Sequence, residues 1–355
     1  MKAMTRPLLA LTQGDPAGVG PEIVVASWQD DALHDVCRPL AVGHPEVFRR
    51  AAQLWQVPLE VVEVDQPDQL AATPGRMPCL ATGGPDATQV PPGQIDPRGG
   101  QAAVDAVVAA TRLAQAGRIH GLVTGPLNKA ALQAAGHDYP GHTELLAHLC
   151  GGPQVAMMLY LSPQPGIGGP AGLGVVHATL HMSLAKALQA LTTDRIVTCI
   201  ELAADALMRL GAGRLTAVPR IGVCAVNPHA GEAGLFGSEE QELIEPAVRQ
   251  CRGQGHEVSG PFPADTLLAR ARDGEFDSVV AMYHDQGHIA LKLLGMHQAV
   301  NMTLGLPVVR TSVAHGTAFD LAWKGRAETS GMIAAVRVAA QLAGMPTVLP
   351  GMRHS

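Results

Sequence analysis

Short apolar runs rich in β-branched residues recur along the whole chain and alternate with longer segments in which apolar positions repeat with helical spacing. Such runs predict buried strands, and a repeat of about 3.6 residues predicts amphipathic helices. Their alternation is typical of an α/β protein in which helices cover largely parallel sheets. The expected strands span residues 8–12, 39–42, 59–64, 120–124, 155–161, 173–178, 221–226, 278–283 and 300–312.

Three of the intervening segments carry clear helix signals. Asp194 is a candidate N-cap for a helix whose apolar stripe runs over residues 196–210. A capping-box pattern opens a second helix over 239–250, and Pro246 should kink it because proline removes a backbone donor. The third segment, 102–116, is rich in alanine, which favours helix.

Length and composition restrict the class of protein. A chain of 355 residues, at roughly 150 residues per domain, favours two domains and therefore a cleft. The formal net charge of -6, without long charged runs, gives no electrostatic footprint for nucleic acid. No apolar stretch approaches the roughly 18–20 residues that cross a bilayer, and the run at 8–11 is too short for a secretory signal. We expect a cytoplasmic protein without nucleic-acid or membrane partners.

Histidine stands out among the residues that carry chemistry. The six cysteines stand singly, which fits neither a disulfide framework nor a cysteine zinc site. In contrast, 15 histidines accompany only 5 Phe, 3 Trp and 3 Tyr. Because imidazole binds metals and transfers protons near neutral pH, the placement of the histidines is the informative feature.

Three histidines share one structural context. His181, His229 and His284 each follow an expected strand by a few residues. The carboxyl ends of parallel strands gather at one edge of a sheet, where open α/β sheets bind ligands. Three neutral imidazoles with an open position suit a divalent metal, and zinc is the first choice for nitrogen ligands. Taken singly, each is more typical of a surface or hydrogen-bonded histidine, and only the shared position brings the metal interpretation level with that alternative.

The neighbours of two of these histidines are suited to holding an imidazole. The segment 227–232 is a turn that would hold His229 rigidly, and Asp285 and Gln286 offer a carboxylate and an amide beside His284. Partners of this kind select one imidazole tautomer. Helix capping by Asp285 and Gln286 is an equally good interpretation.

Polar residues embedded in apolar segments indicate an anionic ligand. Lys292 lies in an apolar run, where it either reaches solvent along its aliphatic stem or supplies charge for an anionic substrate. Asn301 and Arg310 lie within strand-like segments. A buried arginine needs an anion, and the planar guanidinium suits a phosphate or carboxylate. The alternative for Arg310 is an internal salt bridge.

Two glycine-containing turns are candidates for nucleotide contact. The segment 14–22 follows the first strand and opens a helix, but its spacing is neither G-x-G-x-x-G nor a P-loop, so a tight strand-to-helix turn is the favoured interpretation. The segment 315–320 combines a turn of small residues with Asp320, a carboxylate that could accept a ribose hydroxyl. Taken alone, this second signal is weak.

Eight stretches together carry a family resemblance. In order along the chain they are GDPAGVGPEI (14–23), VTGPLNKAAL (123–132), GHTELLA (141–147), TLHMSL (179–184), NPHAGEAGLFGSEE (227–240), GPFPADTL (260–267), YHDQGHIALKLLG (283–295) and NMTLGLPVVRTSVAHGTAFDLA (301–322). With them the chain resembles the 4-hydroxythreonine-4-phosphate dehydrogenase family of pyridoxal phosphate biosynthesis. One departure is Trp323, which stands where the related loop usually has glycine.

The resemblance implies a fold, an assembly and a cofactor. The fold would be isocitrate/isopropylmalate dehydrogenase-like, with two α/β/α domains and a cleft between them. The first, cofactor-side domain would comprise 1–135 together with 297–355, and the second, metal- and dimer-side domain 136–296. The family further implies a homodimer whose active site lies at the interface with ligands from both subunits, NAD or NADP as cofactor, and a divalent metal, zinc before magnesium or cobalt.

Residue roles follow by motif. The implied metal ligands are His181, His229 and His284. The implied substrate-binding residues are His142, Thr143, Lys292, Asn301 and Arg310. The implied cofactor-binding residues are Gly316, Thr317 and Asp320. Lys292 and Asp265 are the candidate proton acceptors.

The expected reaction is oxidation of 4-phosphooxy-L-threonine to a β-keto acid that decarboxylates to 3-amino-2-oxopropyl phosphate. One alternative is a paralogue acting on D-erythronate 4-phosphate, D-threonate 4-phosphate or a terephthalate-type cis-dihydrodiol. Retention of GHTE and VVRTS favours a phosphorylated substrate. A non-catalytic protein that binds a small anion or a metal on the same scaffold is the alternative from another class.

Overall fold

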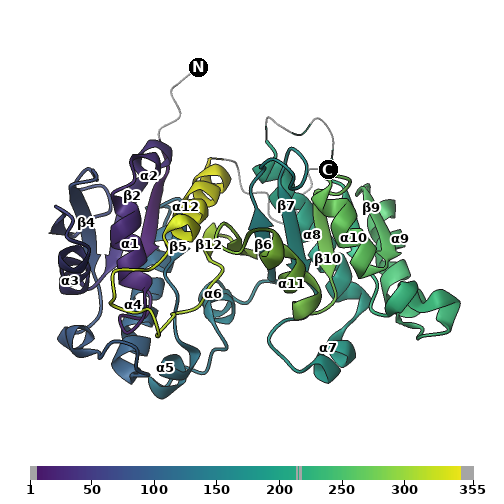
Figure 1. Ribbon diagram of the computed structural model, residues 1–355, viewed down its shortest axis with the longest axis horizontal. Coiled ribbons are helices and arrows are strands. Elements are labelled where there is room, and N and C mark those ends of the chain that lie inside the picture. Colours follow the sequence, from purple (N-terminus) through teal and green to yellow (C-terminus); the bar gives the residue numbers. More distant parts are fainter. Residues whose placement is uncertain (1–5, 213–214, 216–217, 345–355) are drawn as a thin grey trace. The chain divides into compact units, whose positions relative to one another are not determined.

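The computed structural model describes residues 6–212, 215 and 218–344, and the chain divides into two compact units. The first unit comprises Met1–Pro153 and Leu306–Pro346, and the central segment Gln154–Gly305 belongs to the second. Figure 1 shows helices and strands mixed in both, with the second unit in teal and green. This agrees with the α/β class that the sequence pattern predicts.

The first unit is built on a parallel sheet with the strand order β3, β4, β2, β1, β5, β12. Helix α4 packs on the central strands β1, β2 and β5, while α12 packs on β5 and β12. The strands are β1 (Leu8–Thr12), β2 (Arg38–Gly43), β3 (Glu60–Val64), β4 (Arg76–Ala81), β5 (Gly121–Thr124) and β12 (Arg310–Val313). The helices are α1 (Gly20–Trp28), α2 (Asp31–Val36), α3 (Pro45–Trp55), η1 (Pro85–Gln89), α4 (Pro97–Gln115), α5 (Lys129–Ala134), α6 (His142–Leu149) and α12 (Ser330–Ala343).

The sheet of the second unit is mixed, in the order β11, β6, β7, β10, β8, β9. The pairs β11–β6 and β6–β7 are antiparallel, and the remaining pairs are parallel. Its strands are β6 (Ala156–Leu161), β7 (Leu173–His177), β8 (Ile221–Cys224), β9 (Val258–Phe262), β10 (Ser278–Ala281) and β11 (Val300–Leu304). Its helices are α7 (Leu184–Ala190), α8 (Thr193–Leu210), η2 (Pro228–Gly234), η3 (Glu240–Ile244), α9 (Glu245–Gly253), α10 (Ala264–Arg272) and α11 (His284–Gly295).

The expected strands occur, but the run 300–312 is two strands, β11 and β12. Gly305 separates them with a φ of +84°, and a side chain there would lie 2.1 Å from the Gln154 carbonyl oxygen. The apolar pattern continues past this turn because Leu306, Val308 and Val309 are also buried, so the pattern alone does not reveal the break. Strands β4 and β9 were not predicted, since each contains proline, a residue depleted in strands.

The predicted helices differ from the structure mainly at their ends. Thr192, and not Asp194, caps α8, because its side chain accepts from the backbone N–H of Arg195, while Asp194 lies in the first turn. The expected 239–250 helix is divided into a π-helical turn, η3, and the α-helix α9. Pro246 lies in the first turn of α9, where its missing N–H costs no hydrogen bond.

The units divide the chain at different residues from the expected domains. Residues 136–153 group with the first unit, where α6 contacts α4, and residues 297–305 group with the second, where β11 pairs with β6. Both differences arise because strand pairing and helix packing join segments that are distant in sequence. Within the described residues, no helix has the length and apolar character to span a membrane.

Candidate functional site

The three histidines predicted as metal ligands follow three neighbouring strands of the second unit. Strand β10 pairs in parallel with β7 on one side and β8 on the other, so their carboxyl ends share one sheet edge. His181 follows β7, His229 follows β8 and His284 opens α11 directly after β10. The expected strand-end arrangement is therefore confirmed, and the metal-binding role of the three residues stays a prediction.

The structure brings His181 and His284 together. Their ring centroids are 5.8 Å apart. The Nδ1 atom of His284 lies 2.6 Å from the Asp285 carboxylate, which selects the tautomer that carries its proton on Nδ1 and leaves Nε2 free for a ligand. Asp285 therefore orients the imidazole. The neighbouring Gln286 instead bonds the backbone at Met282 and Ala225, a structural role.

His229 is carried by an unusual turn. Its Nδ1 lies 3.1 Å from the Glu232 carboxylate, and its ring contacts the edge of Phe236. The carboxylate of Glu240 accepts the backbone N–H groups of Val226 and Asn227 and so anchors the start of this turn. Within this turn, four non-glycine residues adopt the left-handed region: His229, Ala230, Glu232 and Ala233.

Over residues 6–212, 215 and 218–344, no three His, Cys, Asp or Glu side chains converge as a metal site. The donor set nevertheless fits a divalent metal. His284 and His229 each bind a carboxylate through Nδ1, which leaves Nε2 as the ligating nitrogen. Nitrogen ligands of this kind favour zinc among the common divalent cations.

Two further histidines, which the sequence interpretation did not include, adjoin His284. His288 stacks on His284 with ring centroids 3.8 Å apart and an interplanar angle of 12°. Its Nδ1 lies 3.0 Å from Nε2 of His177, which ends β7 and is completely buried. The i, i+4 spacing from His284 on α11 was the available signal for His288, whereas His177 had none beyond its place at a strand end.

Burial keeps the imidazoles of His177 and His288 neutral. Burial, followed by the nearby His288, lowers the pKa of His177 well below the ordinary histidine value. Burial also lowers the pKa of His288 to about 3, with smaller contributions from His284 and Lys292. Both rings of this pair are therefore uncharged at neutral pH.

A buried arginine, Arg310, begins β12 in the first unit. This residue is 3% exposed, and its Nε and Nη2 donate to the Thr124 hydroxyl at 3.2 and 2.8 Å. Burial lowers the pKa of Arg310 to about 9, and the Glu144 carboxylate opposes the shift. The guanidinium therefore stays a buried cation at neutral pH.

The other expected substrate residues belong to both units. In the first, His142 and Thr143 open α6; burial and the Arg310 charge lower the pKa of His142, and its buried Nε2 has no hydrogen-bond partner among the described residues. In the second unit, Lys292 lies on α11, and Asn301 lies on β11 with its Oδ1 similarly unsatisfied by the described residues. Unsatisfied buried polar atoms mark places where a ligand can bind.

The candidate proton acceptors differ in their surroundings. Lys292 is half-buried and lies close enough to lower the pKa of His288. Asp265 is exposed in the first turn of α10, where it accepts the backbone N–H of Thr266. Only Lys292 is thereby linked to the histidine cluster by a described interaction.

The two glycine-containing turns of the first unit contact each other. Val19 donates its backbone N–H to the Thr317 carbonyl, and a side chain at Gly18 would lie 2.8 Å from Thr317. The prediction of a tight strand-to-helix turn at 14–22 is therefore confirmed. Gly316 and Asp320 are exposed on the partner turn, and their cofactor role stays a prediction.

Trp323 adopts the backbone conformation that a glycine would favour, with a φ of +58°. Its backbone N–H donates to the Glu22 carboxylate, and its indole N–H donates to the Pro16 carbonyl at 2.7 Å. The Arg50 guanidinium lies 4.1 Å above its ring, and both residues line a cavity of about 430 Å³. These contacts offset the strain of a large residue at this position.

Comparison with known proteins gives the family. The family model described as "Pyridoxal phosphate biosynthetic protein PdxA" matches residues 35–339. A D-threonate 4-phosphate dehydrogenase of Pectobacterium atrosepticum is 44% identical over 95% of this chain and 99% of that protein. A 4-hydroxythreonine-4-phosphate dehydrogenase of Desulforapulum autotrophicum is 42% identical over 94% and 95%.

Solved structures agree with this assignment. The crystal structure of a 4-hydroxythreonine-4-phosphate dehydrogenase from Klebsiella pneumoniae is 43% identical, covers 95% of this chain and 99% of that one, and superposes with a TM-score of 0.82. The chain therefore belongs to the PdxA family and is an oxidoreductase, a dehydrogenase that acts on a CH–OH group.

Proposed function

We propose that the protein is a nicotinamide-dependent, metal-assisted dehydrogenase of a four-carbon hydroxy acid that carries a 4-phosphate. D-threonate 4-phosphate is the first candidate substrate, because relatives at 44% identity carry that name. 4-Phosphooxy-L-threonine is the second, because the matching name is carried by relatives at 42% and 40% identity and by solved structures at 43% and 44% identity.

The observation that carries the proposal is the buried Arg310 cation. A guanidinium at 3% exposure that keeps its positive charge at neutral pH is suited to an anion, and a phosphate matches its planar fork. Thr143 and the unsatisfied Nε2 of His142 supply further polar groups in the same unit. We assign this group to the phosphate, with Lys292 and Asn301 of the second unit as the remaining substrate residues.

We assign the metal to the histidines of the second unit. His181 and His284 would hold it, joined by His229 as the third ligand. When bound, a divalent ion, zinc before magnesium or cobalt, lowers the pKa of the substrate alcohol and polarises the ketone so that carboxylate can leave as CO₂. Asp285 orients His284, and Lys292 is the first candidate to accept the alcohol proton, before Asp265, because Lys292 lies beside the histidine cluster.

We further propose a homodimer that completes the metal site. Ile289, Leu293 and Met296 are exposed by 57%, 82% and 53%, and their i, i+4, i+7 spacing puts them on one face of α11, the helix that carries His284. Such an apolar face is typical of a subunit interface. A second copy seated there would bring its own His229 to the His181–His284 pair.

The cofactor is NAD or NADP, bound at the turn that contains Gly316, Thr317 and Asp320. The support is the open Gly316, which allows close approach, and the exposed carboxylate of Asp320, which can accept a ribose hydroxyl. A 2′-phosphate would meet repulsion at that carboxylate, so NAD is the first choice.

The test is a substrate panel assayed with both nucleotides and a divalent metal. It compares D-threonate 4-phosphate, D-erythronate 4-phosphate, 4-phosphooxy-L-threonine and a terephthalate cis-dihydrodiol by reduced-nucleotide absorbance and CO₂ release. We expect turnover of a 4-phosphate, and its loss on chelation. Preference for the unphosphorylated diol, or full activity without metal, would contradict the proposal.

Arg310→Met tests the phosphate assignment directly. Loss of a buried charged contact should raise the KM for the phosphorylated substrate roughly 100-fold and leave the KM for nucleotide unchanged. Arg249→Met, which removes an exposed guanidinium paired with Glu245, is the matched control and should change neither constant. An unchanged substrate KM in Arg310→Met would show that the phosphate binds elsewhere.

A further inference from the structure

A buried histidine pair behind the expected metal ligands has no role in the function proposed above. His177 ends β7 and is completely buried, and His288 is 7% exposed on α11. The two are 111 positions apart in sequence, yet Nδ1 of His288 lies 3.0 Å from Nε2 of His177. Two imidazoles removed from water and bonded to each other are unusual, because an apolar pair would fill the same space without a polar group to satisfy.

The contacts of the pair assign its protons. Nδ1 of His177 faces the Met157 carbonyl oxygen at 3.4 Å, and a carbonyl can only accept. In the neutral ring, Nδ1 of His177 therefore carries the proton, and its Nε2 is the acceptor. Nδ1 of His288 must then donate, which leaves Nε2 of His288 without a proton. The relay holds both rings in one tautomer and one orientation.

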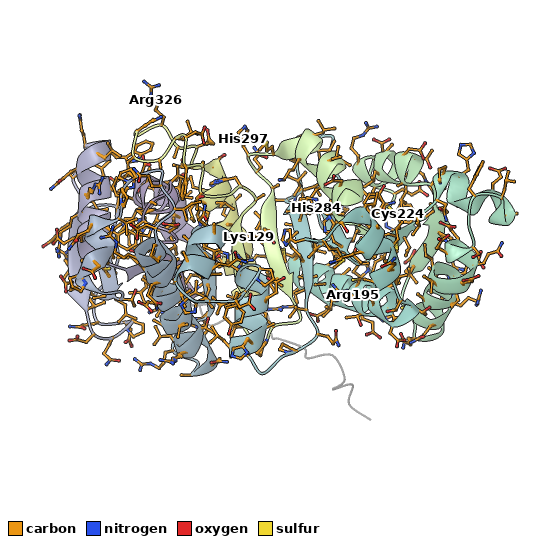
Figure 2. All side chains as sticks on the ribbon, turned by 90° about the horizontal axis from the view of Figure 1, so that it is seen from below. Lys129, Arg195, Cys224, His284, His297 and Arg326 are labelled. Atoms are coloured by element: carbon orange, nitrogen blue, oxygen red, sulfur yellow. The ribbon has the colours of Figure 1, made fainter. Side chains whose placement is uncertain are left out.

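The surrounding backbone is built to bring His177 to this place. A side chain at Gly287 would lie 2.6 Å from Nε2 of His177 and 2.5 Å from Val175, so only glycine lets α11 approach β7 here. Arg195 of α8 donates to the backbone carbonyls of His177 and Ala178 (both Arg195 and His284 are labelled in Figure 2). His177 is thus anchored on both its side-chain and its backbone atoms.

On the side away from His177, the His288 ring contacts His284, an expected metal ligand. The His288 ring stacks on His284 at 3.8 Å with 12° between the planes, while Asp285 bonds the Nδ1 edge of His284. The stacking on His288 fixes the plane of the His284 ring. The bond to Asp285 fixes the rotation of the ring within that plane. Lys292 lies one further turn along, so His284, His288 and Lys292 share one helix face.

We propose that His177 and His288 are positioning residues for the metal site: His177 locks the His288 ring, and the locked ring holds the plane of His284 so that its Nε2 is aimed at the cation. This inference rests on the proposed metal-binding role of His284. Partners that orient a metal-binding histidine typically change metal affinity 10- to 100-fold when removed.

The test is a Co²⁺ titration of the metal-stripped full-length protein, read by competition with a chromophoric chelator and by the visible spectrum of the bound ion. His288→Leu and His177→Leu should each weaken Co²⁺ binding about 10- to 100-fold and change that spectrum. His177→Gln keeps an acceptor for His288 Nδ1 and should restore most of the affinity. A loss in His177→Gln equal to that in His177→Leu would overturn the relay.

Two further variants separate positioning from folding. His34→Leu removes another buried histidine, bonded to the Trp28 carbonyl in the first unit, and should leave Co²⁺ affinity and spectrum unchanged. The double variant His177→Leu/His288→Leu leaves no polar partner unpaired, so it should recover stability but not affinity. Wild-type affinity in the double variant would overturn the inference. Absence of Co²⁺ binding by the unaltered protein would instead overturn the metal role on which the inference rests.

Discussion

Asp15 is an acidic residue whose pKa is strongly shifted by burial. It follows β1, is completely buried, accepts the backbone N–H of Ala17 through Oδ1, and has no partner for Oδ2 among the described residues. Burial raises the pKa of Asp15 to about 6; the bond from Ala17 opposes the shift and the Asp96 charge adds to it. The folded protein therefore holds this proton more tightly than the unfolded chain does.

The sign of the pH dependence follows from that difference. Between the unfolded pKa of 3.8 and the folded value of about 6, the native state binds more protons, so this group lowers the free energy of unfolding as pH rises through the window. Asp15→Asn removes the effect. We expect the variant to gain up to about 3 kcal/mol relative to wild type between pH ~4 and pH ~6. Urea unfolding of both proteins at pH ~4 and at pH ~6 measures the difference in their free energies of unfolding. The same difference at both pH values would refute the raised pKa of Asp15.

Among the elements, the turn between β1 and α1 depends most closely on glycine. The turn containing Thr317 packs so tightly on it that a methyl group at Gly18 would lie 2.8 Å from both the Thr317 side chain and its carbonyl oxygen. The backbone at Thr317 cannot move away from Gly18 without breaking the hydrogen bond that the Thr317 carbonyl accepts from the Val19 N–H. A larger side chain in one turn must therefore displace the other turn.

Gly18→Ala should disturb this element and the proposed cofactor turn together. We expect a loss of about 1–3 kcal/mol in the free energy of unfolding, as for other overpacked sites, and a higher KM for the nucleotide. Gly253→Ala is the matched control, because a side chain there meets nothing within 4 Å and alanine favours the helix α9. Calorimetry measures the stability of the two variants, and initial-rate kinetics measures their KM for the nucleotide. An unchanged nucleotide KM in Gly18→Ala would show that this turn does not affect cofactor binding.

For the whole molecule, the proposed dimer is the property with the largest functional consequence. Leu293, in the middle of the apolar face of α11, is 82% exposed, more than any other large apolar side chain among the described residues. If the partner supplies a metal ligand, assembly and activity must be lost together.

Leu293→Glu should place a charge in the interface and yield folded, inactive monomers, since burying an unpaired carboxylate is costly. Met208→Glu changes an apolar residue of α8 that is 49% exposed and serves as the control, with assembly and activity expected to remain. Light scattering during size-exclusion chromatography gives the mass. A dimeric, fully active Leu293→Glu variant would contradict the proposed interface.

Much of the fold was predictable because its signals are local. β1 matches its predicted bounds, and the segment around α8 was recognised from its apolar stripe, although Thr192 rather than Asp194 caps it. The break at Gly305 was missed because the apolar residues Leu306, Val308 and Val309, which follow it, continue the pattern of the strand. The candidate site divides in the same way into local and long-range signals. Residues next to strand ends were predicted, whereas the contact between His177 and His288, which depends on distant segments, was missed.

The sequence by itself determined the α/β class, the strands after which His181, His229 and His284 lie, and the buried cation at Arg310, since each depends on the order of apolar and polar residues within a short segment. Only the tertiary structure decided that His177 bonds His288, that Arg310 bonds Thr124, and that His181 and His284 meet. Those contacts depend on which strands become neighbours and in what register, a choice made by packing free energy summed over the whole sheet. A pattern within one short segment does not determine this total packing free energy.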